Sequence, residues 1–208
     1  MMGLYIQYGC GFSAPGEWRN FDSSPTLRYE RLPVVGRVYT KNSARFPANV
    51  EYGDIVKGLP IPSGSCLGIY ASHILEHLSL ADFRIALKHT YDLLQPGGVF
   101  RLVVPDLGIL ARRYVSSPEA IAAEVFMRET RLGIETQPRG FWRLVQDMLR
   151  KSKHLWMWDY KSLESELTSL GFVKVRRCQF GDASDAMFKL VENEQRFLDA
   201  VALDAQRL

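Results

Sequence analysis

Short apolar stretches recur along the first half of the chain, and each one ends at a glycine, an acidic residue or a serine. Four stretches have the length and the aromatic or β-branched composition of buried strands. They cover residues 4–8, 18–21, 50–52 and 66–71. A fifth stretch, residues 99–104, is apolar except for Arg101, as is typical of a central parallel strand. The pattern predicts five strands before residue 106.

Other segments carry apolar residues at the spacing of an amphipathic helix. They cover residues 81–94, 107–114, 118–132, 140–149 and 160–170. Asp159 precedes the last of these where an N-cap is expected, and Gly171 follows it where a left-handed residue ends many helices. Two strands over 173–180 and 187–191, and a final helix over 194–208, complete the prediction. Residues 23–49 have weak periodicity, which predicts an irregular connection with one short helix.

Strands that alternate with helices indicate an α/β fold with a Rossmann-like, doubly wound and mainly parallel sheet. A length of 208 residues suits a single domain over residues 1–208. The helical segment 107–153 follows the fifth strand, and we expect it to form an insertion that caps one side of the ligand site.

Polar residues and glycines follow the predicted strands in order. They are Gly9, Asp22, Asp54, Ser72 and Asp106. Ligands of open α/β sheets bind outside the carboxyl ends of the strands. The sequence therefore predicts a ligand site at the edge where these residues meet.

The turn after the first strand, Gly9-Cys10-Gly11, would allow backbone to approach a ligand closely because glycine has no Cβ. Asp22 could accept hydrogen bonds from a ribose diol. A dinucleotide fingerprint, however, places its acid about 20 residues further on, after a full helix. Pro15 and Gly16 interrupt a connection that is too short for that helix, which disfavours a classical NAD or FAD site.

Four motifs, in order along the chain, resemble those of the class I S-adenosylmethionine-dependent methyltransferases, in a type 11-like variant with a short first crossover. They lie at residues 6–22, 53–62, 70–78 and 94–101, and include the runs IQYGCG, GDIVKGLPIP, YASHILEHL and LQPGGVFR. The resemblance also extends to residues 154–160 and 170–172. It implies a Rossmann-like sheet with an antiparallel last strand.

The resemblance implies S-adenosylmethionine as the cofactor and assigns its contacts. The methionine and ribose parts would lie against Gly9, Cys10, Gly11, Asp22 and Ser23. The adenine would lie against Asp54 and Ile55, and the sulfonium and the acceptor would lie near Ser72 and His73. Many relatives carry an acid in the first strand where this chain has Gln7, so we expect weaker or water-mediated binding of the cofactor's ammonium group.

Methyl transfer from a sulfonium needs alignment of donor and acceptor, and a base only if the acceptor is a poor nucleophile. The candidate bases are His73, His77 and His154, because imidazole titrates near neutral pH. Glu76 or Asp106 could orient one of them. His77 could equally pack at the start of the next helix, and His154 could have a structural role. No metal is expected, because His73 and His77 form only half a zinc site and no third ligand is suitably spaced.

The composition limits which classes of acceptor and which cellular compartment we expect. The net charge of +3 is a modest basic excess, which disfavours nucleic acid as a partner. Basic and aromatic residues alternate over 139–158, where they could line an acceptor pocket or form a docked helical lid. No apolar run reaches the roughly 20 residues of a membrane span, and the three cysteines form no disulfide or metal motif. We expect a cytoplasmic protein whose acceptor is a small molecule, with a sugar or sugar nucleotide favoured by the resemblance.

Two other functions remain open at this stage. The domain could bind S-adenosylmethionine without catalysing a reaction, as Gln7 and the short crossover suggest, and then act as an interaction protein. It could also carry out nicotinamide-dependent redox chemistry. An active methyltransferase requires an open cavity beside His73, so side chains that fill this space would exclude the enzyme.

Overall fold

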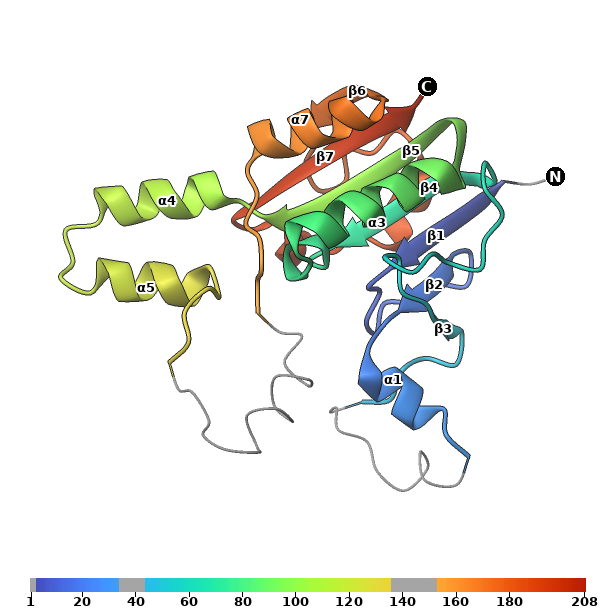
Figure 1. Cartoon of the computed structure of the whole chain (residues 1–208), viewed down its shortest axis with the longest axis horizontal. Coiled ribbons are helices and arrows are strands. Elements are labelled where there is room, and N and C mark those ends of the chain that lie inside the picture. Colours follow the sequence, from blue (N-terminus) through green and yellow to red (C-terminus); the bar gives the residue numbers. More distant parts are fainter. Residues whose placement is uncertain (1–2, 34–43, 136–152) are drawn as a thin grey trace.

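The computed structural model describes residues 3–33, 44–135 and 153–208. These residues form one seven-stranded sheet with the order β3-β2-β1-β4-β5-β7-β6 (Figure 1). The strands are β1 (Leu4–Tyr8), β2 (Arg19–Asp22), β3 (Val50–Tyr52), β4 (Cys66–Ser72), β5 (Leu94–Pro105), β6 (Phe172–Arg177) and β7 (Ala200–Arg207). Strands β1 to β5 pair in parallel, and β7 pairs antiparallel with β5 and β6. The predicted Rossmann-like sheet with an antiparallel last strand is confirmed.

The strand order reverses beside β1, because the chain runs outward through β2 and β3 and then returns to place β4 on the other side of β1. After β1 the chain therefore continues to β2, whereas after β4 it continues to β5 on the other side of the sheet. Open α/β sheets bind ligands at the carboxyl edge beside such a reversal.

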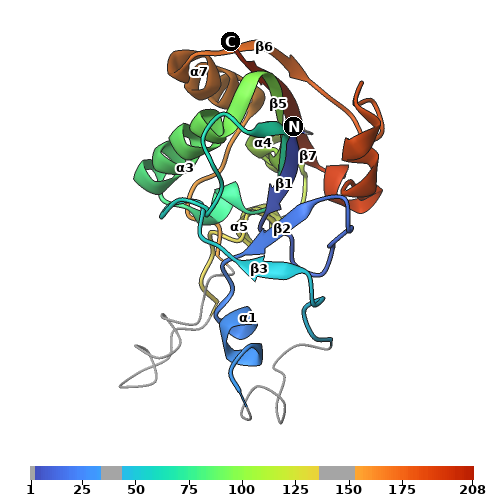
Figure 2. The same ribbon diagram turned by 90° about the vertical axis from the view of Figure 1, so that its right-hand side faces the viewer.

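Two helices, α3 (Leu80–Leu93) and α7 (Tyr160–Leu170), cover one face of the sheet (Figure 2). Both begin at side-chain caps: Ser79 accepts from the Asp82 backbone N–H, and Asp159 forms a capping box with Ser162. Gly171 ends α7 at φ 105°, as its position predicts. The apolar stripes of both helices join the main core, which includes Phe83, Leu87, Leu163, Leu167 and Phe172.

The opposite face is covered by the segment between β6 and β7, which contains the short 3-10 helices η2 (Ala186–Leu190) and η3 (Glu194–Phe197) (Figure 2). Phe188 of η2 is buried in a second core with Trp18 and Tyr70. The rings of Trp18 and Phe188 meet edge to face, with centroids 5.5 Å apart. A compact irregular segment thus covers this face of the sheet, as α3 and α7 cover the other face.

The sequence predictions were wrong near the C-terminus. Residues 187–191 are not a strand but largely η2, and residues 194–208 are not a helix but η3 and β7. Strand β7 inserts between β5 and β6 and is buried on both faces, with Val201, Ala202 and Leu203 almost inaccessible. The helix predicted over 118–132 is shorter, α5 (Ala122–Glu129), and β5 begins earlier, at Leu94. The helix predicted over 140–149 lies outside the described residues.

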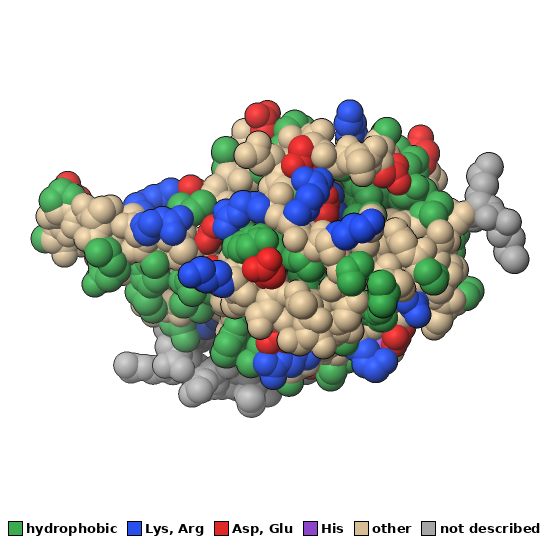
Figure 3. Space-filling view, turned by 90° about the horizontal axis from the view of Figure 1, so that it is seen from above, with side chains coloured by type: hydrophobic (Ala, Val, Ile, Leu, Met, Phe, Trp, Pro, Cys, Tyr) green, Lys and Arg blue, Asp and Glu red, His purple; other side chains and the backbone are tan. Residues whose placement is uncertain are grey.

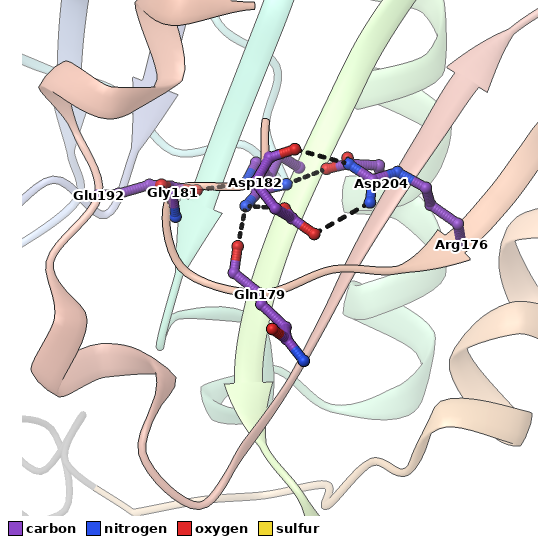
Figure 4. A network of polar contacts seen from close by, with 7 residues as sticks. Arg176, Gln179, Gly181, Asp182, Glu192 and Asp204 are labelled. Atoms are coloured by element: carbon purple, nitrogen blue, oxygen red, sulfur yellow. Dashed lines mark hydrogen bonds and ion pairs between the residues drawn. The ribbon is translucent and has the colours of Figure 1, made fainter. Parts of the chain in front are cut away.

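A polar network ties β5 to β7 and to the segment after β6 (Figure 4), and the ion pairs of Arg101 put this residue at its centre. Its side chain is fully buried and forms ion pairs with Asp182, Glu192 and Asp204. It also donates to the Gln179 carbonyl oxygen at 2.7 Å. Arg176 binds Asp182 and Asp204 from the other side. The network anchors the chain immediately before η3, which contributes to the site described below.

Three further helices complete the description: η1 (Leu75–His77) after β4, α1 (Pro25–Glu30) after β2, and α4 (Leu107–Ser116) after β5. Helices α4 and α5 project from the carboxyl edge of the sheet (Figure 1). The face seen in Figure 3 has Lys and Arg side chains scattered among acidic and hydrophobic ones. Over the described part of the chain, no helix is both long and apolar enough to span a bilayer.

Candidate functional site

The carboxyl ends of β1, β2, β4 and β5 lie side by side, as their parallel registers require. The residues that follow these ends are Gly9, the Asp22–Ser23 pair, His73 and Asp106. These residues therefore share one edge of the sheet. One half of this edge lies at the ends of β1 and β2, and the other half lies at the ends of β4 and β5. The two halves carry different polar side chains.

Gly9 and Gly11 form the turn after β1, and both adopt left-handed backbone, with φ 67° and 56°. A Cβ on Gly9 would lie 2.7 Å from Cγ1 of Ile74, so this glycine allows the loop after β4 to approach. A Cβ on Gly11 would meet no atom within 4 Å. Of the two glycines, Gly11 is the one whose backbone is open to a ligand.

The Asp22 carboxylate is held in place by the backbone on both sides. Its Oδ2 accepts from the Gly11 N–H at 3.0 Å, and its Oδ1 accepts from the Ser24 N–H at 2.7 Å. Each carboxylate oxygen has a second lone pair, so the group can also accept bonds from a diol. Cys10 is half-buried beside it, and burial together with the Asp22 charge raises the pKa of its thiol to about 12.

Asp54 and Ile55 lie in the turn that follows β3. Asp54 Oδ1 accepts from the Val56 N–H at 3.1 Å, and the Lys57 ammonium lies 3.7 Å from Oδ2. Ile55 is buried in the main core, and its carbonyl accepts from His89 Nδ1 at 2.7 Å. The turn is therefore fixed, with one carboxylate at its outer edge.

The Gln7 side chain is buried, and its amide group forms hydrogen bonds within the protein. Its Nε2 donates to the Ser13 carbonyl at 2.8 Å and to Asn20 Oδ1 at 2.6 Å, while Asn20 donates to the Pro15 carbonyl. These bonds shape the short first crossover, which has no helix over the described residues 9–18. Gln7 thus builds the loop and leaves no side-chain acid at this position.

His73 follows β4 with φ 52°, a left-handed conformation that is strained for a residue other than glycine. Its backbone N–H donates to the Val103 carbonyl at 2.8 Å, which holds the turn against β5. Its ring Nε2 donates to the Arg196 carbonyl at 2.8 Å. Its Nδ1 therefore carries a lone pair, and it lies 3.5 Å from Glu76 Oε1.

His77 and His154 approach the same carboxylate. The Nε2 atoms of both rings lie 3.9 Å from Glu76 Oε1, and the ring centroids are 5.0 Å apart. Backbone bonds to the Glu76 carbonyl bring the two segments together: Leu155 donates at 2.7 Å and Trp156 at 3.2 Å. Structure thus joins the three histidines that sequence analysis selected separately.

Burial determines the charge state of this cluster. It raises the pKa of the Glu76 carboxyl to about 7, although Arg131 and Arg196 nearby partly oppose the change. It lowers the pKa of His154 to about 4, with the neighbouring His77 and Arg131 adding to the effect. The pKa values of His73 and His77 are also lowered by burial. All three imidazoles are therefore neutral at pH 7.

A cavity of about 370 Å³ opens over these side chains. Its lining includes His73, Glu76, His77, Arg131, His154 and Arg196. Arg131 and Arg196 are exposed, and neither forms an ion pair with a described residue. The space beside His73 is thus an open, polar cavity.

Sequence reasoning found the histidines but understated Glu76, which lies at their centre, and missed the two arginines. The spacing of His73, Glu76 and His77 was visible, but their approach to His154 depends on tertiary packing. Asp106, considered as an orienting acid, instead caps α4 by accepting from the Gly108 and Ile109 N–H groups. Ser72 lies at the end of β4, as expected. Of the interleaved basic and aromatic segment, residues 139–152 lie outside the described residues.

No protein-family model and no curated protein matches this sequence. Solved structures do match it. A SAM-dependent methyltransferase from Archaeoglobus fulgidus has a TM-score of 0.52 and 15% identity over 98% of this chain and 86% of its own. A possible histamine N-methyltransferase from Thermotoga maritima has a TM-score of 0.51 and 14% identity over 100% and 84%.

A structure of PigF with SAH has a TM-score of 0.51 and 15% identity over 99% of this chain. This chain spans about half the length of that protein (50%) and of the CurJ carbon methyltransferase (48%). The strand order, the antiparallel β7 and the three matches with TM-scores above 0.5 agree with one another. The chain has the fold of the class I S-adenosylmethionine-dependent methyltransferases.

Proposed function

We propose that this protein is an enzyme that transfers a methyl group from S-adenosylmethionine to a small-molecule acceptor. The observation that carries the proposal is the open cavity lined by neutral histidines, beside the end of β4 on a methyltransferase fold. Such a cavity is what an acceptor requires, and it counts against a domain that only binds the cofactor.

The residues on the β1–β2 side fit the cofactor. Gly11 leaves open space where a side chain would stand, and the Asp22 carboxylate is held by two backbone N–H groups with lone pairs remaining for the ribose hydroxyls. Asp54, whose Oδ1 accepts from the Val56 N–H within its turn, would accept from the adenine amino group. When bound, S-adenosylmethionine supplies an electrophilic methyl group on a sulfonium. Because Gln7 is occupied internally, the ammonium group would be bound by backbone or water.

On the other side of the edge, the protein's task is to orient the acceptor and take its proton. His73 Nδ1 is a suitable base, because donation from Nε2 to the Arg196 carbonyl leaves Nδ1 deprotonated. Its rigid, left-handed turn fixes the direction of that lone pair. An acceptor hydroxyl hydrogen-bonded to Nδ1 would lose its proton as it becomes methylated.

The acceptor that best suits this cavity is a sugar nucleotide or another phosphorylated sugar. Arg131 and Arg196 present two exposed guanidinium groups without ion-pair partners among the described residues, and guanidinium groups bind phosphate in a bidentate manner. A hydroxyl of the sugar could then reach the histidines.

Transfer of labelled methyl from S-adenosylmethionine to a panel of sugar nucleotides and sugar phosphates tests this function. We expect a labelled product with the wild type, and a loss of about 10²–10⁴-fold in kcat for His73→Asn. Arg131→Gln should raise KM and leave kcat nearly unchanged. The surface variant Lys88→Gln, far from the cavity, is the control. Equal turnover by the wild type and His73→Asn would refute the role of His73, and no labelled product with any member of the panel would refute a sugar nucleotide or phosphorylated sugar as the acceptor.

A further inference from the structure

The floor of the cavity brings three potential metal ligands to one point. A carboxylate oxygen of Glu76 and one ring nitrogen each of His77 and His154 lie within 4.8 Å of one another. Two imidazole nitrogens and one carboxylate oxygen form a donor set typical of catalytic zinc sites. The sequence shows only part of this set, because His154 comes from a distant segment.

Glu76 is the most unusual member of this cluster. Its side chain is 1% exposed, and neither carboxylate oxygen accepts a hydrogen bond from a described residue. A buried carboxylate without a partner is costly. The imidazole nitrogens at 3.5–3.9 Å are too far away to be hydrogen-bond donors, and no Lys or Arg among the described residues forms an ion pair with it. A bound cation would satisfy this group.

His77 is oriented as a metal ligand. Its Nδ1 donates to the Lys153 carbonyl at 2.8 Å, so the lone pair is on Nε2, which faces Glu76. A backbone carbonyl that fixes the tautomer in this way is the usual outer partner of a metal-bound histidine.

We propose that Glu76 Oε1, His77 Nε2 and one ring nitrogen of His154 bind a divalent transition-metal ion of the Zn²⁺ class. Tetrahedral zinc with bonds of about 2.0–2.1 Å separates its ligand atoms by about 3.3 Å. The two observed distances from Glu76 Oε1 are 3.9 Å, so each ligand needs to move by less than about 1 Å. The fourth position faces the cavity, with His73 beside it.

The charges around the site indicate what would occupy the fourth position. One carboxylate neutralises half of a divalent charge, and the exposed Arg131 and Arg196 add positive charge at the rim. An anionic oxygen is therefore the favoured fourth ligand. If the proposed methyl transfer is correct, that oxygen belongs to the ionised acceptor hydroxyl, with His73 as the proton acceptor. Metal binding itself does not depend on that function.

Titration of the purified full chain, without a histidine tag, with Zn²⁺ and Co²⁺ tests the proposal. Calorimetry should give one site with a micromolar or tighter Kd, and Mg²⁺ should not compete. Co²⁺ should give the visible absorption of a nitrogen- and oxygen-ligated tetrahedral ion. His154→Gln and Glu76→Gln should each weaken binding by about 100-fold or more. His89→Gln, which changes the one histidine outside the cavity, should bind as tightly as the wild type.

Glu76→Gln also guards against loss of structure. The neutral amide relieves the buried charge, so the metal-free variant should have a Tm at or above that of the wild type. Zn²⁺ should raise the Tm of the wild type and leave that of the variant unchanged. Wild-type binding absent at millimolar metal would overturn the proposal, as would binding unaffected by Glu76→Gln. A thiolate-to-cobalt charge-transfer band would also overturn it by assigning the metal to cysteine. Because none of these titrations contains S-adenosylmethionine, their outcome is independent of the methyl-transfer assay.

Discussion

Replacement of Arg101 by methionine should destabilise the fold by about 3–5 kcal/mol, the usual cost of removing one partner from a buried ion pair. Methionine fills much of the volume of the arginine stem, so the loss is electrostatic rather than a cavity effect. Asp182 and Asp204 keep their ion pairs with Arg176. Glu192 does not: its side chain is fully buried, and its described contact besides Arg101 is the Gly181 N–H at 2.9 Å. Most of the lost stability therefore comes from the buried Glu192 carboxylate, which no longer has its ion pair.

Urea unfolding followed by far-UV circular dichroism measures this loss directly. For a chain of this size, 3–5 kcal/mol corresponds to a fall in Tm of about 6–20 °C. The double variant Arg101→Met/Glu192→Gln should recover more than about 1 kcal/mol, because the stranded carboxylate is then neutral. Arg84→Met, which breaks the exposed pair with Glu166, should cost less than about 1 kcal/mol. A loss of stability for Arg101→Met no larger than that of the control would show that the buried ion pairs contribute little to the fold. A double variant no more stable than Arg101→Met would show that the loss does not come from the Glu192 charge.

Two further predictions concern local structure. Asp159→Ala should cost about 1 kcal/mol by removing the N-cap of α7. Its hydrogen bonds with Ser162 lower the pKa of Asp159, so the capping contribution is present above the unfolded pKa of about 3.9 and is lost as pH falls through the lower folded value. Urea midpoints of the wild type and Asp159→Asn should therefore converge in acid, and a constant gap would contradict this. Gly9→Ala should cost about 2–5 kcal/mol, because the left-handed backbone is strained and Ile74 blocks the new Cβ, whereas Gly11→Ala meets open space and should cost only about 1–2 kcal/mol. Equal losses in thermal unfolding would show that Ile74 can move aside.

The elements that the sequence predicted well are those whose burial leaves a periodic signal. Helix α7 shows its stripe, its cap and its terminal Gly171, and both ends were found at the observed residues. Strand β7 has no such signal. Its sequence, AVALDAQR, is rich in good helix formers, and it becomes a strand because β5 and β6 leave a place between them. That place is a property of the whole sheet and cannot be read from the eight residues themselves.

The candidate site also has one part that the sequence predicts and another part that depends on tertiary packing. The positions of Gly11, Asp22 and His73 follow from the rule that parallel strands end at one edge, which the chain order of strands and polar residues reveals. The meeting of Glu76 with His154 depends on how the segment before α7 packs against η1. No local pattern encodes this contact, and for that reason sequence spacing alone suggested only half of a metal site.

The proposed function requires that the β1–β2 edge binds S-adenosylmethionine. Calorimetric titration of the wild type and Asp22→Asn with S-adenosylmethionine and S-adenosylhomocysteine measures this binding. We expect micromolar binding by the wild type, about −8 kcal/mol, and at least a tenfold loss in Asp22→Asn. Asp92→Asn, an exposed acid paired with Lys88 at the far end of α3, should bind like the wild type. Absence of binding at millimolar ligand, with both variants folded, would contradict the account and leave the fold without its expected cofactor.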